Sequence, residues 1–302
     1  MLSRRNVRIK IMQVLYAGQR QEFVSPRAYD SLLMGFVRTS FQLYLLNLLI
    51  VQRVCEYTKH DIATRRAKLR PTAEDKAFSS ILADNPSVRS LTDNVELSRK
   101  YDEYGVRGMV DADQVQSLYR EFIQTVEFKN YHSENDMGRE PTIALLLKLY
   151  KWLQSHELFL NMVEDHFPLW KEDKSLVVGA IKKTIKAAPL EQNFFQAYES
   201  HGESIVDFGR PLLKFVVDAD EQLLTRIKTV LQNWDADRVA IIDMILIKMA
   251  MGEFLQFPKI APEVTMNEYV DISKVYSTDK SREFVNGVLD NLQKALAKDG
   301  LV

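Results

Sequence analysis

The sequence has few of the residues that mark disulfide-linked, metal-binding or membrane proteins. Cys55 is the only cysteine, so neither an intrachain disulfide nor a multi-cysteine zinc site can form. This usage suits a reducing compartment. The most apolar stretch, Phe41–Val51, contains Gln42 and Asn47 and is shorter than the about 20 apolar residues of a spanning helix. We therefore predict a buried helix there, and a cytoplasmic protein with no membrane partner.

Glycine and proline are also scarce. Eleven glycines and nine prolines in 302 residues are few for strands joined by tight turns, and no segment alternates regularly as a sheet strand does. Apolar residues instead recur at three- and four-residue steps, as at Val7, Ile11 and Val14. The sequence therefore predicts an all-α fold.

Breaks in this periodicity outline the helices. Pro26 suits a helix start, and unbroken helices are expected over Asp111–Phe128 and Ile143–Phe159 because no breaker interrupts them. Further helical patterns follow Gly202, at about Ser204–Phe215, Ala219–Asn233, Asp237–Leu255, Val264–Val275 and Asp279–Ala297. We predict an N-terminal helical region over residues 1–199 and a C-terminal subdomain over residues 200–302.

The sequence contains only weak catalytic or metal-binding patterns. The five histidines are scattered, and Glu164-Asp165-His166 has no second ligand four residues on. The sequence contains neither a glycine-rich phosphate loop nor a Gly-x-Ser-x-Gly turn. We therefore expect no catalytic residues, no metal and no cofactor, so the protein is predicted not to be an enzyme.

Charge is distributed unevenly along the chain. The net charge is −1, yet residues 1–20 contain several cations and no acidic residue. On a helix Arg4, Arg5 and Arg8 would lie off the apolar stripe, free for solvent or ligand. A basic end on a near-neutral body indicates a local anion site. A solvated helix face is the competing interpretation.

Motifs in the last third of the chain add a resemblance. From Asn233 the chain reads Asn-Trp-Asp-Ala-Asp-Arg-Val-Ala-Ile-Ile-Asp, followed by Gly252-Glu253-Phe254. It later reads Pro-Glu-Val-Thr-Met-Asn-Glu over residues 262–268, and Ser-Arg-Glu-Phe-Val-Asn-Gly-Val-Leu-Asp over residues 281–290. This order resembles the NusB family of transcription antitermination factors. Arg4-Arg5, Arg8, Gln13 and Leu15-Tyr16 are similar to the family's arginine-rich first helix over residues 1–25.

The resemblance implies an all-helical bundle of two subdomains, with Pro26 to Ala197 holding a long helical insertion whose role is open. It also implies that the protein, with NusE (a small-subunit ribosomal protein), binds boxA-type RNA. The complex would join elongating RNA polymerase with other Nus factors and support ribosomal RNA transcription. Some family members form homodimers that cover the arginines.

Carried over residue by residue, the resemblance implies RNA contacts at Arg4, Arg5, Arg8, Lys10, Gln13, Lys280, Arg282, Phe284 and Asn286. Arginine suits this role because it neutralises phosphate and stacks on bases. Phe284 would stack a base, or else pack in the core. Gly287 is expected to permit close helix packing, because it lacks a Cβ.

Contacts with NusE are implied for Tyr16, Asp237 and Asp243. Asp237 and Glu253 are equally compatible with ordinary surface carboxylates or caps. A second basic cluster, Arg65, Arg66, Lys68 and Arg70, is either a solvated helix end or an extension of the RNA path.

Two other classes of function stay open. A NusB-like module also precedes the catalytic domain of certain ribosomal RNA cytosine methyltransferases, which need a nucleophilic cysteine and a Rossmann-type domain. Here the NusB-like half ends the sequence and Cys55 stands alone. The remaining alternative is a helical protein–protein scaffold that does not bind RNA.

Overall fold

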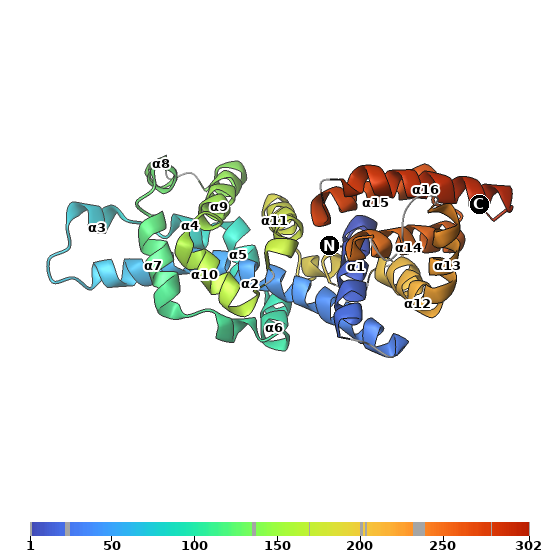
Figure 1. Ribbon diagram of the computed structural model, residues 1–302. Coiled ribbons are helices and arrows are strands. Elements are labelled where there is room, and N and C mark those ends of the chain that lie inside the picture. Colours follow the sequence, from blue (N-terminus) through green and yellow to red (C-terminus); the bar gives the residue numbers. More distant parts are fainter. Residues whose placement is uncertain are drawn as a thin grey trace. The chain divides into compact units, whose positions relative to one another are not determined.

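The computed structural model describes residues 2–21, 25–134, 137–168, 170–199, 202, 204–231, 239–278 and 280–301. These residues form helices, turns and irregular segments, and none of them is in a strand, which confirms the all-α prediction. The chain divides into two compact units (Figure 1). We call Thr39–Glu199 the inserted unit, and Leu2–Arg38 with Ser200–Val302 the terminal unit. The first helix thus packs with the C-terminal helices, whereas the sequence-based division grouped it with residues 39–199.

The terminal unit is built from both ends of the chain. Its elements are α1 (Arg4–Arg20), the start of α2 (Pro26–Arg66), π-helical η3 (Ser204–Gly209), α12 (Arg210–Asp218), α13 (Asp220–Val230), α14 (Ile241–Gln256), α15 (Pro262–Tyr276) and α16 (Ser281–Lys298). Central to them is α14, which packs against α1, α12, α13, α15 and α16. Residues 245–254 of α14 are all buried, so polar groups in this stretch need internal partners.

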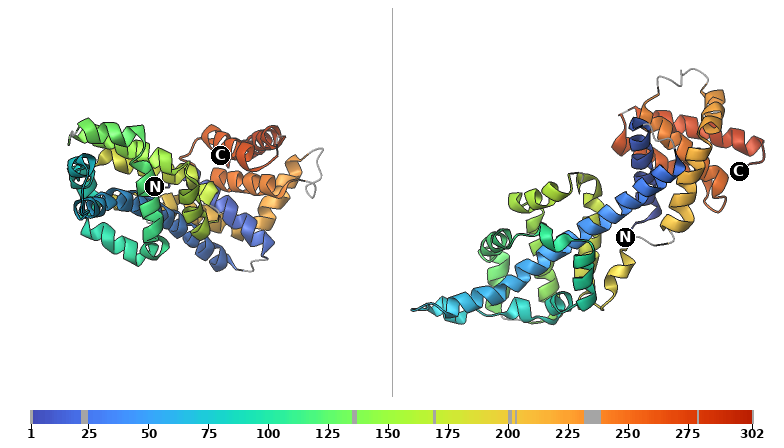
Figure 2. Two further views of the ribbon diagram at one scale, coloured as in Figure 1. Left: turned by 90° about the vertical axis from the view of Figure 1, so that its left-hand side faces the viewer. Right: turned by 90° about the horizontal axis from the view of Figure 1, so that it is seen from below.

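The inserted unit surrounds the rest of α2, seen as the long blue helix in Figure 2. Its other elements are α3 (Ala73–Ala77), α4 (Ile81–Asp84), α5 (Pro86–Thr92), α6 (Val95–Glu103), η1 (Val106–Met109), α7 (Ala112–Phe122), α8 (Val126–Glu134), α9 (Arg139–Leu153), α10 (Glu157–His166), α11 (Trp170–Ala187) and η2 (Phe194–Ala197).

As predicted, Phe41–Val51 lies in a buried helix, with only Gln42 partly exposed. Among the described helices, only α2 is long and apolar enough to cross a membrane. However, 67% of its most apolar stretch is buried inside the protein.

Polar side chains orient helices α9 and α11 on α2. Ser40 donates a hydrogen bond of 2.6 Å to Asp173, and Tyr44 and Thr184 hydroxyls lie 2.7 Å apart. From α9, the Tyr150 hydroxyl donates to the amide oxygen of Asn47 at 3.0 Å. All these groups are buried, so breaking a bond would leave an unsatisfied polar atom. The bonds therefore fix which faces of α9 and α11 point toward α2.

Two expected helices are interrupted, and the expectation of unbroken helices there is wrong. Thr125 separates α7 from α8, because its hydroxyl donates to the Phe122 carbonyl at 2.7 Å and accepts from the Phe128 amide at 3.3 Å. At His156 the extended backbone (φ −91°, ψ 124°) separates α9 from α10. Side-chain hydrogen bonds such as those of Thr125 compete with the backbone hydrogen bonds of a helix. They can therefore end a helix where the sequence contains neither proline nor glycine.

Gly209 provides a test of the packing between η3 and α1. A Cβ built on Gly209 would lie 2.6 Å from Cγ1 of Val7, which is completely buried. We expect Gly209→Ala to lower the free energy of unfolding by about 1–3 kcal/mol, because a stiff β-branched side chain must shift. Urea denaturation would measure this change.

The matched control is Gly35→Ala in the α2 segment of the same unit. Nothing lies within 4 Å of its built Cβ, and Gly35 is exposed. This variant should be stabilised by about 0.5–1 kcal/mol through helix propensity. Equal stability changes in the two variants would contradict the packing described for η3.

Candidate nucleic-acid interface

A buried ion pair fixes α1 in the terminal unit. Arg8 donates from Nε to Oε2 of Glu253 at 2.8 Å and from Nη2 to Oε1 at 2.5 Å. The side chains of Arg8 and Glu253 are 3% and 0% exposed. This two-point geometry is the strongest ion-pair arrangement available to arginine. It joins α1 to α14 across 245 residues of sequence.

Helix α15 completes this pair. The Thr265 hydroxyl donates to Oε1 of Glu253 at 2.8 Å, and the Tyr269 hydroxyl donates to Oε2 at 3.0 Å. Burial opposes the charge on Arg8, but the hydrogen bond and charge of Glu253 outweigh it and raise the pKa of Arg8. Burial and the Glu253 charge raise the pKa of Tyr269 well above its usual value. Both carboxylate oxygens are thus satisfied, as a buried charge requires.

Two expectations about these residues are wrong. Arg8 is not free for solvent or ligand, and Glu253 is not a surface carboxylate. The sequence did contain a signal, because Glu253 follows Leu246 and Met249 at helical spacing and therefore faces inward. Lys10 is also buried, at 6% exposed, with its ammonium 5.7 Å from the centre of the Phe36 ring.

Arg4 and Arg5 remain accessible at the start of α1. Arg4 is exposed, and its guanidinium lies 5.6 Å from the centre of the Phe208 ring. Arg5 is 39% exposed and lies 3.4 Å from both Glu268 and Asp271 of α15. Such exposed pairs contribute little to stability, so they leave the arginine available to another anion. Gln13, farther along α1, is partly buried.

A second group of candidate residues lies at the start of α16. Ser281, which is buried, donates a hydrogen bond of 2.7 Å to Oδ2 of Asp243 and so fixes this helix end on α14. Lys280, Arg282 and Asn286 are exposed, and Phe284 is partly buried.

Lys280, Ser281 and Phe284 border a surface hollow of about 840 Å³, whose lining also includes Asp243 and Asn291. Gly287 also lines it, and nothing lies within 4 Å of its built Cβ. The expectation that Gly287 permits close helix packing is therefore wrong. The hollow combines a cation, an aromatic ring and an amide, which are groups that recognise a nucleotide.

Helix α15 links the two groups. Arg5 contacts Glu268 and Asp271 of α15, and α16 packs along the same helix (Figure 1).

Of the residues expected to contact a protein partner, Tyr16 is partly buried and accepts a hydrogen bond of 3.3 Å from Arg20. Asp243 is 4% exposed, and Asp237 lies outside the described residues.

The second basic cluster is partly occupied by internal partners. Arg65 pairs with Asp61 at 2.9 Å and Asp75 at 3.3 Å, and Lys68 pairs with Asp75 at 2.7 Å. The Lys68 hydrogen bond and the Thr72 backbone amide lower the pKa of Asp75 to about 2. These contacts favour a structural role for Arg65 and Lys68.

Catalytic alternatives gain no support from the geometry. Within the described part of the chain, no group of three or more His, Cys, Asp or Glu residues is arranged to hold a metal ion. Cys55 is buried, and burial followed by the nearby Glu56 charge raises the pKa of its thiol. A thiol in this state is a poor nucleophile.

These features define an all-helical protein with accessible cations on α1 and α16 of one unit. The family model described as "NusB family" matches residues 171–294. Similar proteins, each named transcription antitermination protein NusB, come from Chloroherpeton thalassium (36% identical over 96 residues), Bacillus mycoides (33% over 95) and Methylacidiphilum infernorum (38% over 82). The chain belongs to the NusB family.

The similarity is confined to part of the molecule. The matches cover 32%, 32% and 27% of this chain, and 46%, 73% and 57% of these relatives in the same order. No solved structure matches the chain. The activity and partners of the whole protein are therefore inferred below.

The buried ion pair generates a test of stability. Arg8→Met or Glu253→Leu should each lower the free energy of unfolding by about 3–5 kcal/mol, because one buried charge loses its partner. The double variant should lose less than the sum of the two, because neither charge remains. Urea denaturation of all three variants would measure this coupling.

Arg4→Met is the control, because Arg4 is exposed and should change stability by no more than about 0.5 kcal/mol. Additive losses in the double variant would show that Arg8 and Glu253 do not act as a pair.

Proposed function

We propose that this protein is an RNA-binding transcription antitermination factor. Together with NusE it would bind boxA-type RNA in the cytoplasm. The assembly would join elongating RNA polymerase with other Nus factors and support ribosomal RNA transcription. Membership in the NusB family supports the general role, and the arrangement of α1 supports the RNA contact.

One observation carries the proposal: Arg8 is buried in an ion pair while Arg4 and Arg5, on the same helix, remain accessible. The buried pair holds α1 rigidly, so the accessible arginines are presented without a large ordering cost. Arginine side chains at this end would neutralise phosphates and release counterions. Arg5 would exchange its weak pairs with Glu268 and Asp271 for a phosphate.

The hollow at α16 would hold a base of the same RNA. Phe284 lines it and would stack the base, a contact worth about 1–3 kcal/mol in single-strand binding. Lys280 lines it too, while Arg282 and Asn286 are exposed on the same helix start. These groups would contact phosphate and base edges.

Tyr16 is the residue best placed for NusE, since it remains partly exposed on α1. RNA and NusE bound to one helix would strengthen each other through effective concentration. A homodimer that covers α1 would compete with both. The buried, high-pKa thiol of Cys55 supports a non-catalytic role over one like that of the related methyltransferases.

The RNA site is tested by Arg4→Ala with Arg5→Ala. Affinity for a short single-stranded boxA-like RNA should fall, and the slope of log K against log salt should decrease by about 1.4, since each lost phosphate contact removes about 0.7. Fluorescence anisotropy across a salt series would measure both. Arg8 is left intact because it is structural.

Arg27→Ala with Lys214→Ala is the matched control. It removes the same charge from exposed positions on α2 and α12 of the same unit. An equal loss in both double variants would mean that net charge, not this site, governs binding.

The partner contact is tested by Tyr16→Ala. Affinity for NusE should fall roughly tenfold, as for a central aromatic contact, while affinity for RNA alone should persist. Isothermal titration would compare the two ligands. Asp243 is unsuited to a charge-reversal test, because a lysine there would be buried against Ser281 and would disturb the fold. Unchanged NusE affinity in a folded Tyr16→Ala protein would reject this contact.

A further inference from the structure

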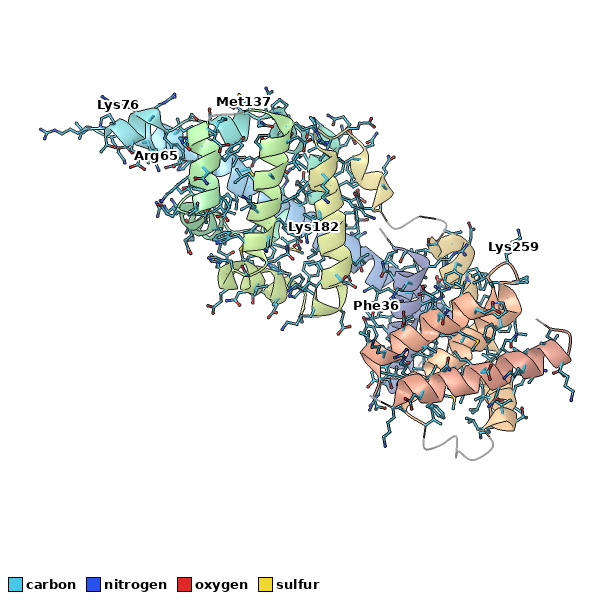
Figure 3. All side chains as sticks on the ribbon, turned by 90° about the horizontal axis from the view of Figure 1, so that it is seen from above. Phe36, Arg65, Lys76, Met137, Lys182 and Lys259 are labelled. Atoms are coloured by element: carbon cyan, nitrogen blue, oxygen red, sulfur yellow. The ribbon has the colours of Figure 1, made fainter. Side chains whose placement is uncertain are left out.

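Helices α9 and α11 form one outer side of the inserted unit. They lie on the same side of α2 in Figure 1, and Figure 3 looks onto this side, with Lys182 labelled. Arg139 at the start of α9 donates to the carbonyls of Lys186 and Ala188 at 2.5 and 2.8 Å. The start of α9 therefore lies beside the end of α11, and the two packed helices run antiparallel.

Four exposed lysines lie on this side. Tyr150 of α9 and Thr184 and Asp173 of α11 face α2, so the opposite faces of both helices point to solvent. These solvent faces carry Lys148 and Lys151 on α9, and Lys182 and Lys186 on α11. We call these four residues the lysine face. Lys183 is exposed at its edge.

The antiparallel arrangement spreads these charges along the helix pair. Lys148 and Lys151 lie near the end of α9, whereas Lys182 and Lys186 lie near the end of α11, at the opposite end of the pair. The 15 residues of α9 span roughly 22 Å. The charges therefore follow a track instead of forming one compact anion pocket.

Among the residues that the structure describes, the four residues of the lysine face lack acidic partners. Some other exposed cations of the inserted unit do pair with acidic neighbours, as Arg53 does with Glu56 and Arg89 with Asp93. Across the described part of the chain, none of the four lysines forms an ion pair. Glu172, near the start of α11, is the nearest exposed acid on that helix face, and Glu140 of α9 pairs with Arg139.

Unpaired like charges oppose helix formation. Lys182 and Lys186 are four residues apart and Lys148 and Lys151 are three apart, so each pair is repulsive on its own helix. Their position near helix C-termini offsets part of this repulsion. A polyanion bound along the track would neutralise the lysines and so remove the remaining repulsion.

The residues between the lysines are small. Ala144 and Ser175 are exposed, and nothing lies within 4 Å of a Cβ built on Gly179. A phosphate chain can approach such a surface closely. A membrane surface is a poorer fit, because these positions lack the large apolar side chains that enter a bilayer.

We propose that the lysine face binds the phosphate backbone of single-stranded RNA without sequence preference. It would thereby give the inserted unit an RNA contact of its own, for RNA that extends beyond the terminal-unit site. This inference rests on the proposed RNA-binding function. Lysine ammonium groups act as point charges toward phosphate and do not read bases, so the contact would add affinity and salt dependence but no sequence specificity.

The test changes all four lysines to glutamine in the full-length chain. Affinity is measured by anisotropy for a short boxA-like RNA, and for the same RNA extended by uridines at its 5′ end or at its 3′ end. Affinity for the short RNA should be unchanged. For at least one extended RNA, affinity should drop and the salt slope should decrease by about 3, from four contacts at about 0.7 each.

Two controls separate charge at this face from other effects. Changing the four lysines to arginine should preserve extended-RNA binding. Changing Arg53, Lys59, Arg89 and Arg99 to glutamine removes equal charge from other helices of the unit and should leave the salt slope for extended RNA close to that of the wild type. Thermal midpoints should change little in all variants, since every altered side chain is exposed.

Equal binding of the extended RNAs by the wild type and the four-glutamine variant would overturn the inference and leave the terminal-unit site intact. An equal loss of extended-RNA affinity in the variant that alters Arg53, Lys59, Arg89 and Arg99 would also overturn the inference. If the wild type bound none of these RNAs, the proposed function itself would fail.

Discussion

The ion pair between Arg8 and Glu253 is the constraint on which the terminal unit depends. Removing two charges from water costs several kcal/mol for each ion, and only near-ideal geometry offsets this. Here the guanidinium bonds both carboxylate oxygens, and Thr265 and Tyr269 donate to the same oxygens. Helices α1, α14 and α15 must all be in place before the charges are satisfied. The pair therefore favours one arrangement of these helices over looser apolar packing.

This constraint accounts for how the chain tolerates a long insertion. The pair joins residues 245 positions apart, so α1 must return to the C-terminal helices whatever lies between. The inserted unit has its own core around α2, positioned by buried bonds such as those of Tyr44 and Asn47. Since each unit has its own hydrophobic core, the insertion does not need to disturb the terminal core.

Arginine and lysine side chains serve two purposes in this protein, and the burial of each side chain determines which purpose it serves. Arg8 and Lys10 lie within the terminal unit and contribute to its packing, whereas Arg4 and Arg5 stay accessible on the same helix. Arg65 and Lys68 are likewise occupied by Asp75, while the lysine face has no such acids. A cation is thus available to a ligand only where no buried carboxylate holds it, as Glu253 holds Arg8 and Asp75 holds Lys68. Counting charges in a sequence cannot reveal this.

The sequence by itself determined the helical class, the buried stripe of α1, the buried run from Phe41 to Val51 and the family. These follow from local periodicity and motif order, which need no knowledge of distant contacts. The roles of Arg8, Glu253 and Gly287, and the breaks at Thr125 and His156, were decided only by the tertiary structure. Each depends on which side chain or backbone atom lies opposite, often from a helix far away in sequence. A charged residue at the edge of an apolar stripe can face water or a buried partner, and the packing of the other helices selects between them.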